Sequence, residues 1–174
     1  MQISTLMINA NTKQLWLLFI LTIGMSIVLQ IQGSDLKTPA APNGIIGLEL
    51  SFTQEKASAI AREWKNDLKK VFHINMILDY LYILIYGAFF FFSCRYFASR
   101  RTIPSSRGNY IAIAVLLAML FDCLENVLMI VSINDAPNNT ITLLTACFAI
   151  LKFSIIIIAI FYILYSLLTL SKNK

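Results

Sequence analysis

Four ionisable residues lie inside long apolar stretches of this 174-residue chain: Asp79, Asp122, Glu125 and Lys152. A charged side chain at the centre of a bilayer costs about 2.5–3.5 kcal/mol or more, so such residues usually face a protein interior. Three carboxylates and one ammonium group do not balance. We therefore expect either that at least one carboxyl group holds a proton or that a cation or a basic ligand completes the balance. Such groups are candidates for proton transfer or for recognition of a ligand.

Helical spacing places further polar side chains beside these charges. Asp122, Glu125 and Asn126 stand at positions i, i+3 and i+4, and therefore share one side of a helix. In the preceding apolar stretch, Tyr82 and Tyr86 follow an acid at similar spacing, and their hydroxyl groups can hydrogen-bond a carboxylate or a ligand. The predicted ligand- or proton-binding residues are Asp79, Asp122, Glu125, Asn126, Lys152, Tyr82 and Tyr86.

The composition indicates an integral membrane protein. The chain is 58% hydrophobic and only 13% charged, whereas soluble domains contain about 25% charged residues. The net charge of +5 does not indicate nucleic acid as a partner, because the basic residues lie mostly between and after apolar stretches and form no basic stripe on a soluble fold. Membrane lipid is the partner that this composition predicts.

Four apolar stretches are long enough to cross about 30 Å of hydrocarbon as helices. They cover residues 15–31, 71–94, 110–133 and 141–170. The first could also be a signal peptide, but a single Lys13 precedes it and no A-x-A site follows closely, so we expect an uncleaved anchor. The sequence predicts an all-α fold, with one domain over residues 1–174 that forms a four-helix membrane bundle.

An additional amphipathic helix is predicted over residues 51–70, between spans one and two. Ser51 and Gln54 have the spacing of a capping box. Ile60, Trp64 and Leu68 recur at helical spacing and form its apolar side. This helix could lie on the membrane, cap the bundle or pack on the next span. On the exported side, it could also dock a membrane protein partner.

The basic residues predict the orientation of the bundle. An arginine-rich loop joins spans two and three, whereas the turn at residues 134–140 has no Lys or Arg. We expect the arginine loop and both termini to be cytoplasmic, in a bacterial inner membrane.

This orientation gives each buried charge a depth in the membrane. At 1.5 Å per residue, Asp79 and Glu125 lie about 12 Å, and Asp122 and Lys152 about 16 Å, from the outer ends of their spans. The four charges are therefore predicted to share one layer. The basic residues at the expected cytoplasmic side are Lys13, Arg95, Arg100, Arg101, Arg107, Lys172 and Lys174.

The cysteine and histidine residues indicate neither a metal site nor a cofactor. Cys94, Cys123 and Cys147 are far apart and form no C-x-x-C pair. His73 is the single histidine of the chain. We interpret the cysteines as small apolar side chains in the helices.

Several short motifs resemble a group of small bacterial four-span membrane proteins without an assigned activity. The matching segments are LEL at 48–50, TQEKASAIAREW at 53–64, LDY at 78–80, FDCLEN at 121–126 and LKF at 151–153. The likeness covers about residues 45–155, and its D-x-x-E-N motif lies in the third span. The resemblance implies the same fold and a polar centre, and it implies no reaction.

The emopamil-binding, sterol-isomerase-like family offers a second comparison, because it also works through acidic groups within a four-helix bundle. His73 is followed four residues later by Ile77, where an acid would be needed for the match. The comparison is therefore one of architecture only.

Three functions are compatible with these observations, and whether the protein is an enzyme stays open. The carboxylate–lysine centre could bind or transport a lipid-like or cationic small molecule, or protons. The protein could instead be an accessory subunit in which the charges hold the helices together. It could also be an intramembrane acid–base enzyme, an isomerase or cyclase of an apolar lipid.

Overall fold

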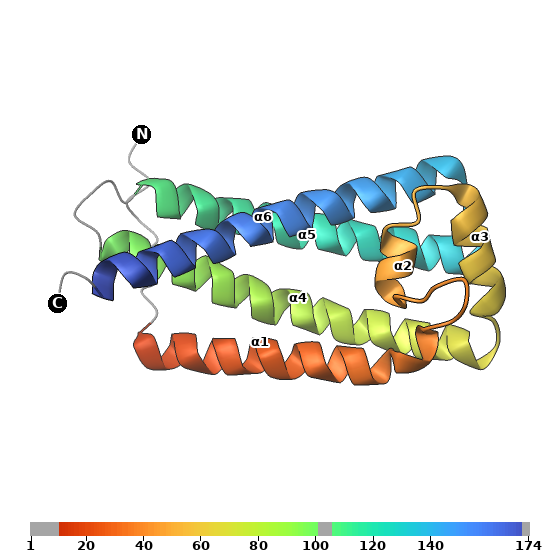
Figure 1. Ribbon diagram of the computed structural model, residues 1–174, viewed down its shortest axis with the longest axis horizontal. Helices are drawn as coiled ribbons and strands as arrows, with labels where there is room; N and C mark the ends of the chain where they lie inside the picture. Colours follow the sequence, from red (N-terminus) through yellow and green to blue (C-terminus); the bar gives the residue numbers. More distant parts are fainter. Residues whose placement is uncertain (1–10, 101–105, 172–174) are drawn as a thin grey trace.

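Four long helices form a bundle in the computed structural model, which describes residues 11–100 and 106–171 (Figure 1). The long helices are α1 (Thr12–Gln32), α4 (Asp67–Ser99), α5 (Ser106–Asn134) and α6 (Asn139–Ser171). The segment between α1 and α4 forms the 3-10 helix η1 (Ser34–Leu36) and the short helices α2 (Ile45–Glu49) and α3 (Gln54–Glu63). The described residues contain no strand. The predicted all-α, four-helix bundle is confirmed.

Each long helix is long and apolar enough to cross a membrane, with mean hydropathy between 1.8 and 2.6 in its most apolar part. Each contains one of the four predicted spans and extends a few residues beyond it. Large apolar side chains cover the outside of the bundle, and Trp16, Ile77 and Phe161 are each more than 60% exposed. So much exposed apolar surface is suited to lipid and not to water. The chain is an integral membrane protein.

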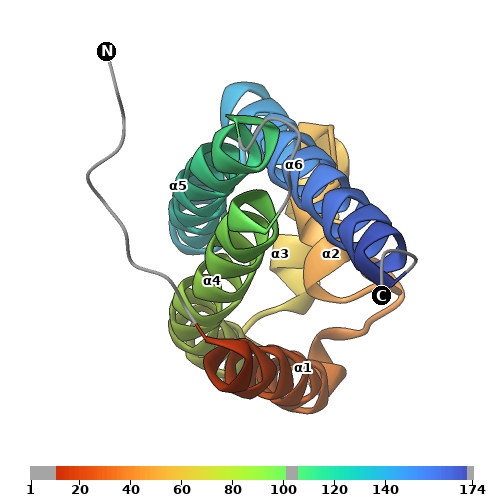
Figure 2. The same ribbon diagram turned by 90° about the vertical axis from the view of Figure 1, so that its left-hand side faces the viewer.

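The four helices are not packed symmetrically. Helix α4 packs against both α1 and α5, and α6 packs mainly against α5. Seen along the bundle, α1 and α6 lie apart, and α4 lies to one side of the space between them (Figure 2). Asn75 of α4 ties α1 in place, because its amide donates hydrogen bonds to the Leu29 carbonyl (3.2 Å) and to Gln32 Oε1 (2.6 Å).

One end of the bundle is closed by η1, α2 and α3, which surround a buried apolar core. Trp64 and Ile60 are fully buried in this core with Leu36 and Phe72. The Trp64 indole donates a 3.1 Å hydrogen bond to the Leu36 carbonyl, which ties the end of α3 to η1. The apolar side of α3 is therefore buried within its own chain, and α3 caps the bundle.

The predicted amphipathic helix at 51–70 is shorter in the structure. Helix α3 ends at Glu63, and Leu68 belongs to the first turns of α4. The break has a local cause, because Asn66 has a left-handed φ of 56° that interrupts the helical backbone. The predicted capping box was also wrong: Thr53 is the N-cap residue and accepts a 3.3 Å hydrogen bond from the Lys56 amide.

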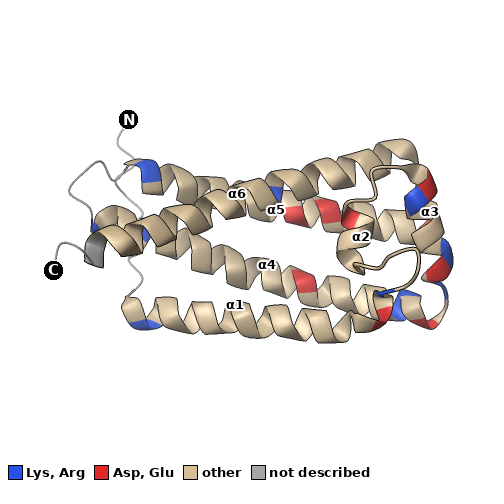
Figure 3. Ribbon diagram, in the orientation of Figure 1, with Lys and Arg blue, Asp and Glu red and all other residues tan. Residues whose placement is uncertain are grey.

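Charged residues are concentrated at the two ends of the bundle and in one group between them (Figure 3). The end where α1 begins and α6 ends carries Lys and Arg but no Asp or Glu among the described residues. Arg101, Lys172 and Lys174, which contributed to the predicted orientation, lie outside the described residues.

Candidate functional site

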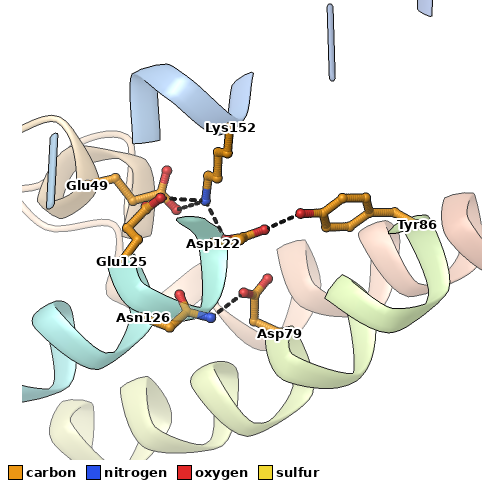
Figure 4. Close-up of polar contacts among 7 residues, drawn as sticks. All are labelled: Glu49, Asp79, Tyr86, Asp122, Glu125, Asn126 and Lys152. Atoms are coloured by element: carbon orange, nitrogen blue, oxygen red, sulfur yellow. Dashed lines mark hydrogen bonds and ion pairs between the residues drawn. The ribbon is translucent and has the colours of Figure 1, made fainter. Parts of the chain in front are cut away.

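The centre of the charged group is Lys152 of α6. Its ammonium donates to Asp122 Oδ1 at 2.7 Å and lies 2.9 Å from Glu125 Oε2, both on α5 (Figure 4). Glu125 is completely buried, and Lys152 and Asp122 are 6% and 4% exposed. The two acids reach the same ammonium because their i, i+3 spacing places them on the side of α5 that faces α6. The predicted buried charge cluster is confirmed.

Helix α4 adds two residues to this cluster. The Tyr86 hydroxyl donates a 2.6 Å hydrogen bond to Asp122 Oδ2, the oxygen that Lys152 does not bind. Asp79 does not contact Lys152 but accepts a 2.6 Å hydrogen bond from the Asn126 amide (Figure 4). Asp79 is thus joined to the cluster through α5.

Tyr82, the other predicted tyrosine of α4, lies next to Tyr86. Its ring lies 5.1 Å from that of Tyr86, centroid to centroid. It lines a cavity beside the cluster, and the hydrogen bond to Asp122 comes from Tyr86.

A fourth carboxylate, Glu49 of α2, was not among the predicted site residues. Its Oε1 lies 3.8 Å from the Lys152 ammonium, and the residue is 7% exposed. Gly44 lets α2 turn in toward the bundle, with a φ of +60° that glycine adopts without strain. The sequence did contain a signal, because Glu49 interrupts the apolar run IIGLEL at 45–50. An acid in such a run suggests a buried partner, even in a segment too short to span a membrane.

The Glu49 carboxyl group is close to a protonation change at physiological pH. Burial raises the pKa of Glu49 from 4.5 to about 7, and the Lys152 ammonium opposes part of that rise. Asp122 and Asp79 add to it by charge repulsion. Glu49 therefore exchanges its proton more readily near neutral pH than an exposed glutamate does.

The charges of the cluster are less balanced than the sequence indicated. Three carboxyl groups, those of Glu49, Asp122 and Glu125, lie within 4 Å of one ammonium group. A fourth, that of Asp79, is linked to them through Asn126. Two of their oxygens, Glu49 Oε2 and Glu125 Oε1, are buried with neither a hydrogen bond nor an ion-pair contact among the described residues. Buried carboxylate oxygens without donors are costly. The cluster can therefore accept further N–H donors, protons or positive charge.

A cavity of about 300 Å³ lies beside the cluster. Three of the acids line it, Glu49, Asp79 and Asp122, whereas Glu125 and Asn126 lie behind its wall. Aromatic side chains complete the lining next to the charges, and these are Tyr82, Tyr86, Phe90 and Phe153. Acids and aromatic faces around a cavity are the surroundings that bind organic cations.

The described residues contain no group of three or more His, Cys, Asp and Glu side chains arranged to hold a metal ion. The three cysteines are free thiols. The acids instead face an ammonium group and a tyrosine hydroxyl, so the site is built for N–H and O–H donors.

Comparison with protein-family models, curated proteins and solved structures gave no match. What the site does must therefore be inferred from its own geometry.

Proposed function

We propose that this integral membrane protein binds a cationic small molecule at the carboxylate cluster. The observation that carries the proposal is the excess of acid. Three carboxyl groups lie within 4 Å of one ammonium, a fourth is linked to them through Asn126, and three of these four line a cavity. Removing charges from water without compensation is expensive, so the bundle gains stability when a cation joins them.

Protonation offers the alternative way to balance the same charge. When the cavity holds no cation, Glu49 takes up a proton near pH 7, and a bound cation displaces that proton. Binding is therefore coupled to proton release, which is the exchange that a cation transporter or a pH-dependent receptor uses. The aromatic lining supports an organic cation over an inorganic one.

The distribution of basic residues supports a membrane orientation for this activity. The bundle end where α1 begins and α6 ends carries only basic charges among its described residues, which favours the cytoplasmic side. The cavity and its cap of η1, α2 and α3 then lie toward the outer half of the membrane. We propose a bacterial inner membrane as its location, in keeping with the four-span proteins that the sequence resembles.

The proposal can be tested with butylammonium chloride and the purified protein in detergent. A ligand that binds only the folded state raises the unfolding temperature. We expect butylammonium to raise it above the effect of sodium chloride at equal ionic strength, and to do so more at pH 8 than at pH 5.

Asp79→Asn is the informative variant, because Asp79 lines the cavity but makes no ion pair with Lys152. It should weaken the butylammonium effect and leave the Lys152 pairs intact. Glu55→Gln, at an exposed acid on α3, is the matched control and should change nothing. If butylammonium acts no differently from sodium chloride on the wild type, the cluster only holds the helices together and the proposal is wrong.

A further inference from the structure

We infer that the ligand is a primary amine with a long apolar chain, and that it reaches the cluster from the lipid, between α1 and α6. This inference rests on the proposed cation site. It adds the chemical class of the ligand and its route, and neither follows from the charge balance alone.

The cavity has its side walls on two helices that do not pack closely together. Ser26 and Leu29 of α1 form one wall, and Phe153 and Ile156 of α6 form the other. Helix α1 packs along α4 and has no extensive contact with α6, and the two helices lie well apart in Figure 2. Phe153 is 39% exposed although it lines the cavity. In a membrane, this side of the bundle faces hydrocarbon.

The route from the aqueous end is less favourable for a cation. Lys37 and Asn43, in the loop after α1, line that end of the cavity, and Lys37 is exposed. An ammonium at this position repels an approaching cation. Entry between α1 and α6 avoids Lys37 and brings the positive head directly to Asp79 and Glu49.

The cluster favours a head group with N–H donors. Glu49 Oε2 is buried without a hydrogen-bond partner among the described residues, and the cluster already holds one primary ammonium, that of Lys152. A primary ammonium carries three N–H donors. A quaternary ammonium carries none, so it would supply charge and leave the buried oxygen unpaired.

The apolar chain of the ligand has a place in the same geometry. Between the acids and the lipid, the cavity is lined by Leu29, Phe153 and Ile156. A chain that leaves the cavity past these side chains stays in contact with apolar surface and enters the bilayer. Head and chain thus match the polar and apolar parts of the lining.

Radiolabelled dodecylamine, measured on the protein in lipid nanodiscs with empty nanodiscs as background, tests the inference. We expect saturable binding that dodecyltrimethylammonium displaces at least tenfold less well than unlabelled dodecylamine. Equal displacement by both compounds would mean that the N–H donors do not matter, and would overturn the assignment of a primary amine.

Two tryptophan substitutions test the route. Ile156→Trp narrows the opening from α6 and should lower dodecylamine affinity at least tenfold, while the butylammonium effect on unfolding temperature is retained. Leu29→Trp narrows the opening from α1 and should likewise lower dodecylamine affinity and retain the butylammonium effect. Ile158→Trp is the control, because Ile158 is 54% exposed and does not line the cavity.

The outcomes separate the two proposals. If butylammonium stabilises the protein but either narrowed variant, still folded, binds dodecylamine like the wild type, the lipid route is wrong and the cation site stands. A narrowed variant that loses the response to both dodecylamine and butylammonium would also contradict the lipid route, because the substitution should affect only the ligand with a long apolar chain. If neither amine acts on the wild type, both proposals fail.

Discussion

Glu49 Oε1 lies 3.8 Å from the Lys152 ammonium, and this pair joins the segment between the first two spans to the charged cluster inside the bundle. Helix α2 is only five residues long, too short to span a membrane, yet it supplies a buried acid to a site built on three spanning helices. The connecting segment is therefore part of the site.

The stability of the folded protein should fall as the pH rises from about 4.5 to 7, because the Glu49 carboxyl group has a higher pKa in the folded than in the unfolded state. Below pH 4.5, both the folded and the unfolded states hold the Glu49 proton. Between 4.5 and about 7 the folded state keeps it and the unfolded state has lost it, so the unfolded state binds fewer protons and stability decreases with pH. The shift corresponds to roughly 3 kcal/mol.

Chemical unfolding in mixed micelles at pH 5 and pH 8 measures this dependence, and Glu49→Gln should remove most of it. Asp67→Asn, at a 91% exposed side chain, provides the control and should keep the wild-type profile. A wild-type protein that is equally stable at both pH values would contradict the expected protonation of Glu49.

Lys152→Met should destabilise the protein by at least about 3 kcal/mol, because it leaves Asp122 and Glu125 buried without their counter-charge. Lys70→Met is a matched control, since Lys70 lies 2.9 Å from Asp67 but on an exposed surface. It should have little effect. Equal unfolding temperatures for the two variants would show that the buried acids are already neutral without Lys152.

Tyr86→Phe should cost about 1–3 kcal/mol, because Asp122 Oδ2 loses its hydrogen-bond donor. Tyr110→Phe, at a residue that is 68% exposed, should be neutral. Thermal unfolding monitored by circular dichroism compares them. A Tyr86→Phe protein as stable as the wild type would mean that another donor replaces the hydroxyl.

Gly108→Ala should weaken the packing of α5 on α4 and α6. A β-carbon at this position would lie 2.7 Å from Ala98 Cβ and against the Tyr162 hydroxyl. Overpacking of this kind costs about 1–3 kcal/mol. Gly24→Ala is the control, because nothing lies within 4 Å of a β-carbon there. The experiment is a comparison of unfolding temperatures, and an unchanged Gly108→Ala protein would show that the helices can move apart freely.

The elements that depend on local patterns could be predicted from the sequence. Hydropathy located the four spans, and helical periodicity placed Asp122 and Glu125 on one side of α5. Topology then put Lys152 at their depth. These predictions need no knowledge of the tertiary structure, because they use only the geometry of a regular helix and the thickness of a membrane.

The connecting segment could not be predicted in the same way. The position of Glu49 depends on the path of residues 33–50, which no periodic pattern describes. The end of α3 depends on the left-handed φ of Asn66 and on the buried Trp64, whose indole donates a hydrogen bond to the Leu36 carbonyl. Periodicity also treated Tyr82 and Tyr86 alike, and only side-chain packing decides that Tyr86 reaches Asp122.

The order of charges along the chain has a consequence for how the protein is made. Asp122 precedes Lys152 by 30 residues, so α5 reaches the membrane before its counter-charge does. During that interval, the two acids of α5 must carry protons or stay out of the lipid. A chain truncated after residue 138 should therefore insert α5 poorly in a membrane-integration assay, and Asp122→Asn with Glu125→Gln should restore insertion. Helix α6 therefore does more than line the site: once it inserts, Lys152 stabilises α5 in the membrane.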